Sequence, residues 1–157
     1  TEAENEPETE TENSTINALP TSSTVLVNGT AVEFEAYNIE GSNYFKLRDI
    51  AKALTGTEKQ FEVTWDESIR AINLISGETY TEVGGELTKG DGSEKEALKS
   101  NVTIYKDGAE VSLTAYNIDG SNYFRLRDLG KAFDFGVFWD EENNAVIIDT
   151  SMGYTEE

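Results

Sequence analysis

The amino-acid sequence predicts an α+β fold made of two homologous repeats, each a small antiparallel sheet packed on one short helix. Three observations lead to this prediction. A fifteen-residue segment occurs twice, turn dipeptides separate runs of alternating hydrophobic residues, and each copy then changes to helical spacing. Because a unit of roughly 55 residues is marginal on its own, we expect extensive contact between the repeats.

The repeat is the strongest signal in the chain. Residues 36–50 read AYNIEGSNYFKLRDI and residues 115–129 read AYNIDGSNYFRLRDL, with twelve of fifteen positions identical. The offset is 79 residues here and 74 further on, where VTWDE at 63–67 matches VFWDE at 137–141. The repetition indicates two homologous units, residues 24–83 and residues 102–154.

The first segment, residues 1–23, differs from the rest in composition. Glu alternates with small or polar residues, and Ser and Thr follow up to Pro20. Such a composition buries too little apolar surface to offset the entropy of ordering. We therefore expect a disordered acidic tether that holds the ordered part away from a surface.

Within the first repeat, the pattern predicts strands around one helix. Asn28-Gly29 and Glu40-Gly41 are turn dipeptides between short apolar strands. Leu47, Ile50 and Leu54 follow helical spacing, although no good capping residue precedes the helix at Lys46. A hairpin of residues 61–65 and 71–75 completes the unit.

The second repeat predicts the same elements, with its helix over residues 126–133 and its last hairpin over residues 135–148. Residues 84–101 are interpreted as the linker between the units. Its first part is rich in glycine, and residues 94–100 are compatible with one or two helical turns.

Composition excludes several classes of function. The chain has no Cys and no His, which argues against thiol catalysis, Cys/His zinc sites and histidine acid–base chemistry. Its net charge of −19 disfavours binding to nucleic acids. No apolar run approaches the roughly 20 residues that span a bilayer, so we expect no membrane insertion by this chain.

One family shows a similar order of motifs. The Asn-Gly turn, the alternating strand, the Leu-Arg pairs at 47–48 and 126–127 and the Trp-Asp pairs at 65–66 and 139–140 resemble the N-terminal stalk domain of copper amine oxidases. The resemblance covers residues 24–83 and again 102–154. The chain departs from that pattern where Lys46 and Arg125 replace the Pro before Leu-Arg.

The resemblance implies a small antiparallel sheet on one helix, in exported and surface proteins of Gram-positive bacteria. It implies no catalysis, since the oxidase chemistry of that family belongs to a separate domain with three His ligands and a quinone made from Tyr. We therefore expect a protein that is not an enzyme and needs no cofactor or metal.

Aromatic and amide residues form the candidate ligand-binding set. Aromatic faces beside amides suit stacking on sugar rings or anchoring of a protein partner. Alternatively, the aromatic side chains face the core and the Asn residues shape turns. The set consists of Tyr37, Asn38, Asn43, Tyr44, Tyr116, Asn117, Asn122 and Tyr123. Phe45, Phe124, Trp65 and Trp139 are expected in the core.

Three other candidates are predicted to be structural. The adjacent acids at 66–67 and 140–141 suit turns better than glycoside hydrolysis. Arg48 and Arg127 are expected to tie helix to hairpin rather than grip a ligand carboxylate. The oxygen-rich segments 91–94 and 140–144 do not fit the spacing of a calcium loop.

The sequence thus predicts a non-catalytic extracellular or cell-surface module, a spacer or adhesion unit that contacts protein or cell-wall polysaccharide. A chain that begins with Thr is typical of a protein whose leader has been removed. The alternatives are a carbohydrate-binding module with a sugar site in each repeat and, less well supported, a glycan hydrolase.

Overall fold

A computed structural model describes residues 15–21, 24–87 and 92–155; the remaining residues, 1–14, 22–23, 88–91 and 156–157, lie outside the described part. Strands make up 48% and helices 11% of the described residues, so the fold is mostly β. The strands in chain order are β1 (Thr15–Pro20), β2 (Thr24–Val27), β3 (Thr30–Val32), β4 (Ala36–Ile39), β5 (Ser42–Lys46), β6 (Phe61–Asp66), β7 (Ala71–Ser76), β8 (Lys95–Lys99), β9 (Thr103–Lys106), β10 (Ala109–Val111), β11 (Ala115–Ile118), β12 (Ser121–Arg125), β13 (Gly136–Asp140) and β14 (Ala145–Asp149). The helices are α2 (Leu47–Ala53) and α3 (Leu126–Phe133).

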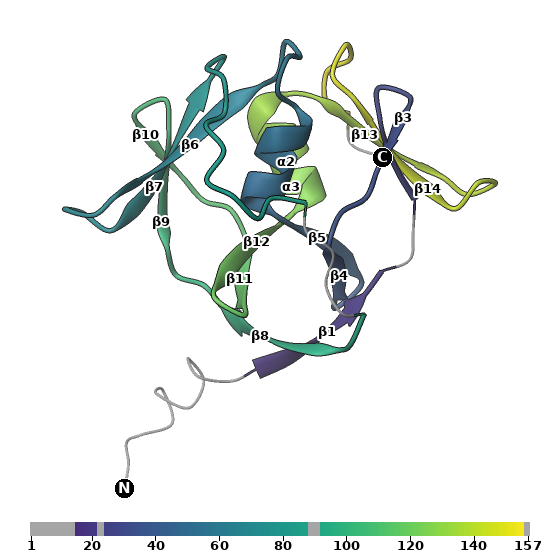
Figure 1. Cartoon of the computed structure of the whole chain (residues 1–157), viewed down its shortest axis with the longest axis horizontal. Coiled ribbons are helices and arrows are strands. Elements are labelled where there is room, and N and C mark those ends of the chain that lie inside the picture. Colours follow the sequence, from purple (N-terminus) through teal and green to yellow (C-terminus); the bar gives the residue numbers. More distant parts are fainter. Residues whose placement is uncertain (1–14, 22–23, 88–91, 156–157) are drawn as a thin grey trace, which may run out of the picture.

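The predicted fold class is wrong, although most of the predicted elements exist. Six strands close into a barrel in the order β1-β4-β5-β12-β11-β8, and two four-stranded sheets have the orders β10-β9-β7-β6 and β13-β14-β2-β3. In Figure 1 the barrel lies below the two helices, and the sheets flank the helices on either side. No sheet with more than one hairpin belongs to a single repeat, so the chain is not two units that each pack a sheet on a helix.

The reason is an exchange of hairpins between the repeats. The β2–β3 hairpin comes from the first repeat but joins β14 of the second through the parallel β14–β2 pair. The β9–β10 hairpin of the second repeat joins β7 of the first in the same way. At the centre, β5 and β12 pair antiparallel with Phe45 opposite Phe124. Each repeat therefore supplies part of every sheet, which a pattern within one repeat cannot reveal.

Two strands close the barrel where the sequence predicted none. The β1 strand lies within the segment predicted to be a disordered tether, and β8 lies where helical turns and a linker were predicted. They pair antiparallel with each other, and Ala18 and Ala97 are both fully buried. These two alanines stand 79 residues apart, the offset of the repeat itself, which was the available signal for both strands. The prediction of disorder for residues 1–14 lies outside the described residues.

Local turn chemistry follows the prediction closely. Asn28 and Glu40 adopt positive φ angles of 51° and 53°, and the glycine after each has a φ near 90°. Two successive residues with positive φ make the type I′ turn that matches the twist of a two-residue hairpin. Asp107 and Asp119 occupy the same turn position in the second repeat.

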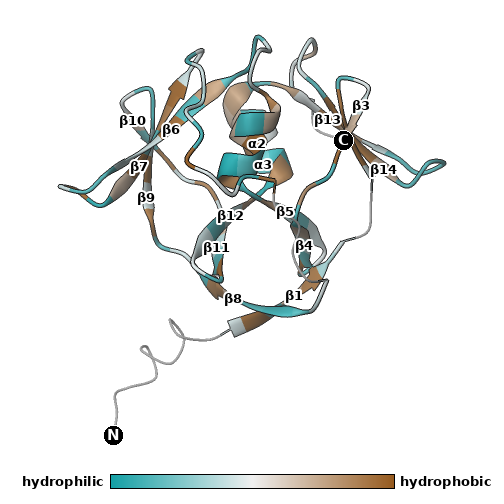
Figure 2. Cartoon of the chain, in the orientation of Figure 1, coloured by the Kyte–Doolittle hydropathy of each residue, from teal (hydrophilic) through white to brown (hydrophobic). Residues whose placement is uncertain are grey.

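Two hydrophobic clusters stabilise the fold. The larger gathers the helices and the inner faces of both side sheets, and the smaller fills the barrel. Successive residues of β5 serve different clusters, because side chains alternate along a strand: Tyr44 faces the barrel interior and Phe45 faces the helices. Figure 2 shows polar turns at the outer ends of the side sheets, with hydrophobic strand residues nearer the centre.

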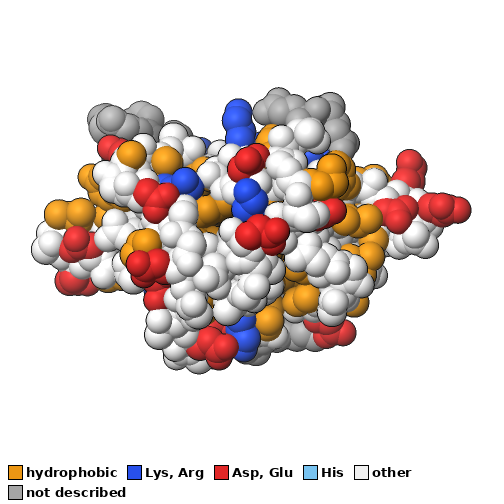
Figure 3. All heavy atoms as spheres, turned by 90° about the horizontal axis from the view of Figure 1, so that it is seen from above, with side chains coloured by type: hydrophobic (Ala, Val, Ile, Leu, Met, Phe, Trp, Pro, Cys, Tyr) orange, Lys and Arg blue, Asp and Glu red, His pale blue; other side chains and the backbone are white. Residues whose placement is uncertain are grey.

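The surface carries the negative charge of the chain. Acidic side chains are spread over the face that Figure 3 shows, whereas the fewer Lys and Arg side chains lie nearer its middle. Among the described residues, neither helix has the length and apolar character that crossing a bilayer requires.

Candidate functional site

The four candidate tyrosines lie inside the barrel. Tyr37, Tyr44, Tyr116 and Tyr123 are between 1% and 6% exposed. They pack edge to face across the two repeats, with ring centroids 5.5 Å apart for Tyr37–Tyr123 and 5.2 Å for Tyr44–Tyr116. Burial raises the pKa of Tyr44, Tyr116 and Tyr123, as expected for rings in a low-dielectric interior. The expectation of an exposed tyrosine surface is wrong, and the alternative that these aromatics face a core is confirmed.

The four candidate asparagines divide into two pairs. The Asn38 and Asn117 side chains each accept a hydrogen bond from the backbone N–H three residues on, at 3.1 Å, and so close the turns at Gly41 and Gly120. Asn43 and Asn122 lie at the start of β5 and β12, where they line two surface pockets. The turn-shaping role is thus confirmed for one pair, and the other pair belongs to the strongest candidate site.

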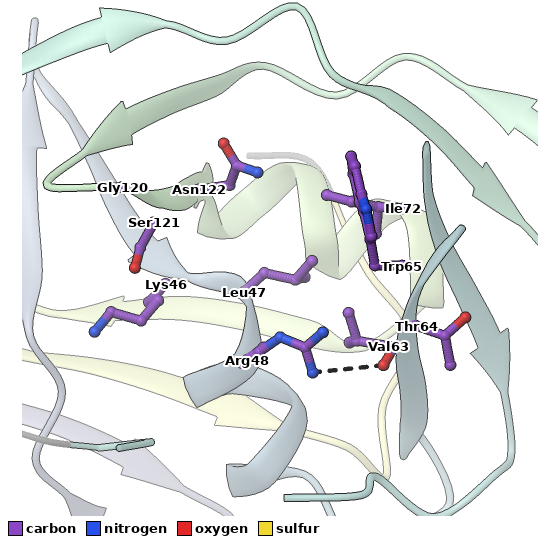
Figure 4. A pocket seen from close by; sticks show the side chains of 10 residues that line it. All are labelled: Lys46, Leu47, Arg48, Val63, Thr64, Trp65, Ile72, Gly120, Ser121 and Asn122. Carbon is purple, nitrogen blue, oxygen red and sulfur yellow. Dashed lines mark hydrogen bonds between the residues drawn. The ribbon is translucent and has the colours of Figure 1, made fainter. Parts of the chain in front are cut away.

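The first pocket has a volume of about 280 Å³ and opens between the two repeats. The start of α2 and the β6–β7 hairpin form one wall, and the β11–β12 turn forms the other. Figure 4 shows its lining side chains, which are Lys46, Leu47, Arg48, Val63, Thr64, Trp65, Ile72, Gly120, Ser121 and Asn122.

The second pocket repeats the first with the roles of the repeats reversed. Its volume is about 230 Å³, and it lies between the start of α3, the β13–β14 hairpin and the β4–β5 turn. Nine of its ten lining residues match the first pocket in residue type or chemical class, and Phe138 replaces Thr64. The lining residues are Gly41, Ser42, Asn43, Arg125, Leu126, Arg127, Val137, Phe138, Trp139 and Val146.

The exposed aromatics of the molecule are the tryptophans of these pockets. Trp65 is 43% and Trp139 is 45% exposed, so the prediction that both lie in the core is wrong. Alternation places Trp65 on the same face of β6 as the buried Phe61 and Val63. The hydrophobic core ends before the strand does, and the last side chain of the series therefore meets the pocket instead. Strand periodicity identifies a face, but it cannot show where the neighbouring element ends.

Both arginines of the Leu-Arg pairs tie a helix to a hairpin, as predicted. Arg48 donates to the Val63 carbonyl at 3.5 Å and to the Tyr80 hydroxyl at 3.2 Å, and Arg127 donates to the Val137 carbonyl at 3.3 Å. The acceptors on the hairpins are backbone carbonyls rather than Asp66 or Asp140. These bonds orient a planar guanidinium at the rim of each pocket, a geometry suited to carboxylate ligands.

The adjacent acids act as turn residues. Asp66 accepts hydrogen bonds from the Ser68 hydroxyl and N–H at 2.7 and 3.0 Å, and Asp140 accepts from Asn143. The Ser68 hydroxyl lowers the pKa of Asp66 and the Asn143 side chain lowers that of Asp140. A glycosidase acid needs a raised pKa, so neither group has the property that glycan hydrolysis requires.

The described residues contain no group of three acidic side chains arranged to hold a metal ion. Part of the segment 91–94 lies outside the described residues, and its predicted lack of a calcium site stays a prediction. The buried carboxyl group of the chain, Asp49, lies under residues 80–87 and away from both pocket linings. Its pKa is raised by burial, which the Leu87 N–H partly offsets.

A small β-rich domain with paired aromatic pockets and no catalytic constellation among its described residues is of the non-catalytic, supporting class. The family model of the copper amine oxidase N-terminal domain matches residues 26–148, more than half of the chain. This protein belongs to the copper amine oxidase N-terminal domain family, whose members form a non-catalytic, stalk-like domain. No curated protein and no solved structure matches the chain.

Proposed function

We propose that the chain is a non-catalytic spacer and adhesion module of an exported bacterial protein, and that it contacts cell-wall glycan through its two tryptophan pockets. The single observation that carries this proposal is the duplication of a half-open pocket with an exposed Trp, an Asn amide and a Ser hydroxyl. Aromatic faces stack on the apolar faces of sugar rings, and amide and hydroxyl groups bond ring hydroxyls.

The architecture supports a spacer role. Each repeat supplies strands to all three sheets, so the pockets are held by one interlocked framework rather than by two loosely joined units. Rigid presentation keeps the entropic cost of binding low, because little has to be ordered on contact. Location at the cell surface is part of the proposal and accords with the acidic segment that precedes β1.

The pockets favour glycan over a flat protein contact. Each is a small concave site with polar groups on one wall and a single aromatic ring on the other. Protein interfaces of standard size bury about 800 Å² on each partner and centre on clustered aromatic anchors. Two separate single tryptophans fit that description poorly, and they fit separate sugar units well.

The test is a pull-down of the full chain on purified peptidoglycan and on other cell-wall polysaccharides. Because β1 closes the barrel, a chain that starts at residue 24 is unsuitable. We expect saturable binding that the double variant Trp65→Ala, Trp139→Ala loses while it keeps its far-UV circular dichroism. The matched control is Met152→Ala, which removes a side chain that is also 45% exposed and lines neither pocket.

Binding by the control and not by the double variant supports the proposal. Failure of the unaltered chain to bind any polysaccharide overturns it and leaves a spacer that contacts protein. Equal binding by the double variant also overturns it, because the contact would then lie elsewhere on the surface.

A further inference from the structure

The charge at the two pockets is opposite to that of the molecule. The whole chain has 31 acids, 12 bases and a net charge of −19. Each pocket is nevertheless lined by two cations and by no acid, Lys46 with Arg48 in one and Arg125 with Arg127 in the other. Four of the twelve bases therefore lie at these two small sites, and the same charge pattern occurs in both.

The two cations of a pocket have different partners. Lys46 pairs with Glu35 at 3.4 Å and Arg125 pairs with Asp128 at 3.3 Å, so these charges are partly compensated within the fold. Arg48 donates its hydrogen bonds to a carbonyl and a hydroxyl, which orient the guanidinium without cancelling its charge. Arg127 makes the corresponding carbonyl contact to Val137. The oriented guanidinium is therefore the anion-binding group that both pockets share.

The tryptophan wall adds the second requirement, a ligand with a ring face. In the first pocket Glu67 accepts the Trp65 indole N–H at 2.7 Å and pairs with Arg70 at 3.3 Å, so this acid is engaged at the edge of the ring. Ser121 and Asn122 face the ring from the other repeat, as Figure 4 shows. A carboxylate for the arginine, a ring for the tryptophan and hydroxyls for the amide together describe an acidic sugar.

The size and the overall charge narrow the ligand further. Volumes of about 280 and 230 Å³ fall below the roughly 300–1,000 Å³ of pockets that enclose drug-sized ligands, and they suit one sugar unit each. A strongly acidic protein repels a dense polyanion. A glycan in which neutral sugars separate the acidic ones avoids most of that repulsion.

We propose that each tryptophan pocket binds one carboxylate-bearing sugar of an alternating acidic and neutral glycan, so that the chain carries two equivalent acidic-sugar sites. The inference rests on the proposed function and specifies its ligand. Both sites are built from both repeats, and each depends on the pairing of β5 with β12. Neither repeat alone forms a complete site.

The experiment is isothermal titration of the full chain with a hyaluronan tetrasaccharide, in which glucuronic acid alternates with N-acetylglucosamine, and with the same tetrasaccharide after reduction of its carboxyl groups. We expect two tetrasaccharides per chain and about tenfold weaker binding of the reduced form, the loss that one charge-assisted hydrogen bond predicts. Trp65→Ala and Trp139→Ala should each lower the stoichiometry to one, and Met152→Ala should leave it at two.

The arginine is tested by Arg48→Gln with Arg127→Gln, which should bind the two tetrasaccharides equally. Because these arginines also tie helix to hairpin, a variant that fails to fold is replaced by salt dependence. Added salt should weaken binding of the acidic tetrasaccharide by the unaltered chain and leave the reduced one unchanged.

The outcomes separate this inference from the proposed function. Equal affinity for the acidic and reduced tetrasaccharides, or a stoichiometry that neither tryptophan variant changes, overturns the acidic-sugar site. Binding to cell-wall polysaccharide with no binding of the acidic tetrasaccharide also overturns it, while the glycan-binding module stands. Absence of binding to every glycan overturns both.

Discussion

Helices α2 and α3 begin with nearly the same residues, yet their surroundings differ. Residues 80–87 cover α2: the Leu87 N–H donates to Asp49 at 2.8 Å, and Lys52 pairs with Glu82 at 3.4 Å. The corresponding Asp128 of α3 is 27% exposed and pairs with Arg125 instead. One sequence motif thus supports a buried carboxylate in one half of the molecule and a surface ion pair in the other.

The covering segment is itself well fastened. The Tyr80 ring is 5% exposed, and its hydroxyl donates to Glu86 while accepting from Arg48. Glu86 also accepts the N–H groups of Val83 and Gly84 at 2.8 and 2.9 Å. Burial alone would raise the pKa of Glu86, but these hydrogen bonds lower it to about 2. The two halves therefore differ because the segment downstream of the first repeat changes how the polar residues of that repeat are used.

The largest expected effect comes from removing the ring that holds the covering segment. Tyr80→Ala should lower the free energy of unfolding by about 3 kcal/mol, as for other buried aromatics. Its counterpart Tyr154 is only half-buried, and Tyr154→Ala should cost about 1 kcal/mol. Urea denaturation measures both. Equal losses would show that residues 80–87 do not distinguish the two halves.

A smaller effect is expected at the helix position where the halves differ in size. Gly130 of α3 stands where α2 has the fully buried Ala51. A Cβ at Gly130 would lie 2.8 Å from Val137 Cγ2 and 3.1 Å from the Phe135 carbonyl oxygen. Gly130→Ala should therefore lower the free energy of unfolding by about 2 kcal/mol, although alanine favours helix.

The reciprocal change, Ala51→Gly, should cost about 1 kcal/mol through helix propensity alone. The melting temperatures of the two variants test the pair. An increase in stability for Gly130→Ala would mean that α3 can move away from β13.

The smallest expected effect, and the one with a distinct pH signature, concerns Asp49. One oxygen of its carboxylate has no hydrogen-bond partner among the described residues, and burial raises its pKa. The folded protein therefore holds this proton more tightly than the unfolded chain does. The stability contribution of Asp49 is greatest below the unfolded pKa of about 4 and is lost as the pH rises through the folded pKa.

Asp49→Asn keeps the acceptor for the Leu87 N–H and removes the charge. It should raise the free energy of unfolding by about 1 kcal/mol at neutral pH and give no gain below a pH of about 4. Denaturation at several pH values measures the difference, and Asp128→Asn is the control, which should lose a few tenths of a kcal/mol at all pH values above its titration. A gain of the same size at acid pH would contradict the assignment to Asp49.

Much of the local structure is predictable because it depends on neighbours in sequence. The Asn28-Gly29 turn, the helix start at Leu47 and the hairpin that ends in Trp65-Asp66 all follow from backbone preferences and side-chain periodicity. The site was predicted less well. Of the eight candidate residues only Asn43 and Asn122 line the pockets, because burial of a tyrosine depends on the strand opposite, which lies in the other repeat.

By itself the sequence determined the repeat, its hairpins and helices, the absence of thiol and imidazole chemistry, and the roles of the turn acids. Each of these depends on residue type or on contacts within a few positions. Tertiary structure decided the exchange of hairpins, the closure of the barrel by β1 and β8 and the position of the tryptophans at two shared pockets. Those features depend on pairing between segments about 79 residues apart, where several arrangements satisfy the same local pattern and only the packing of the whole chain selects one.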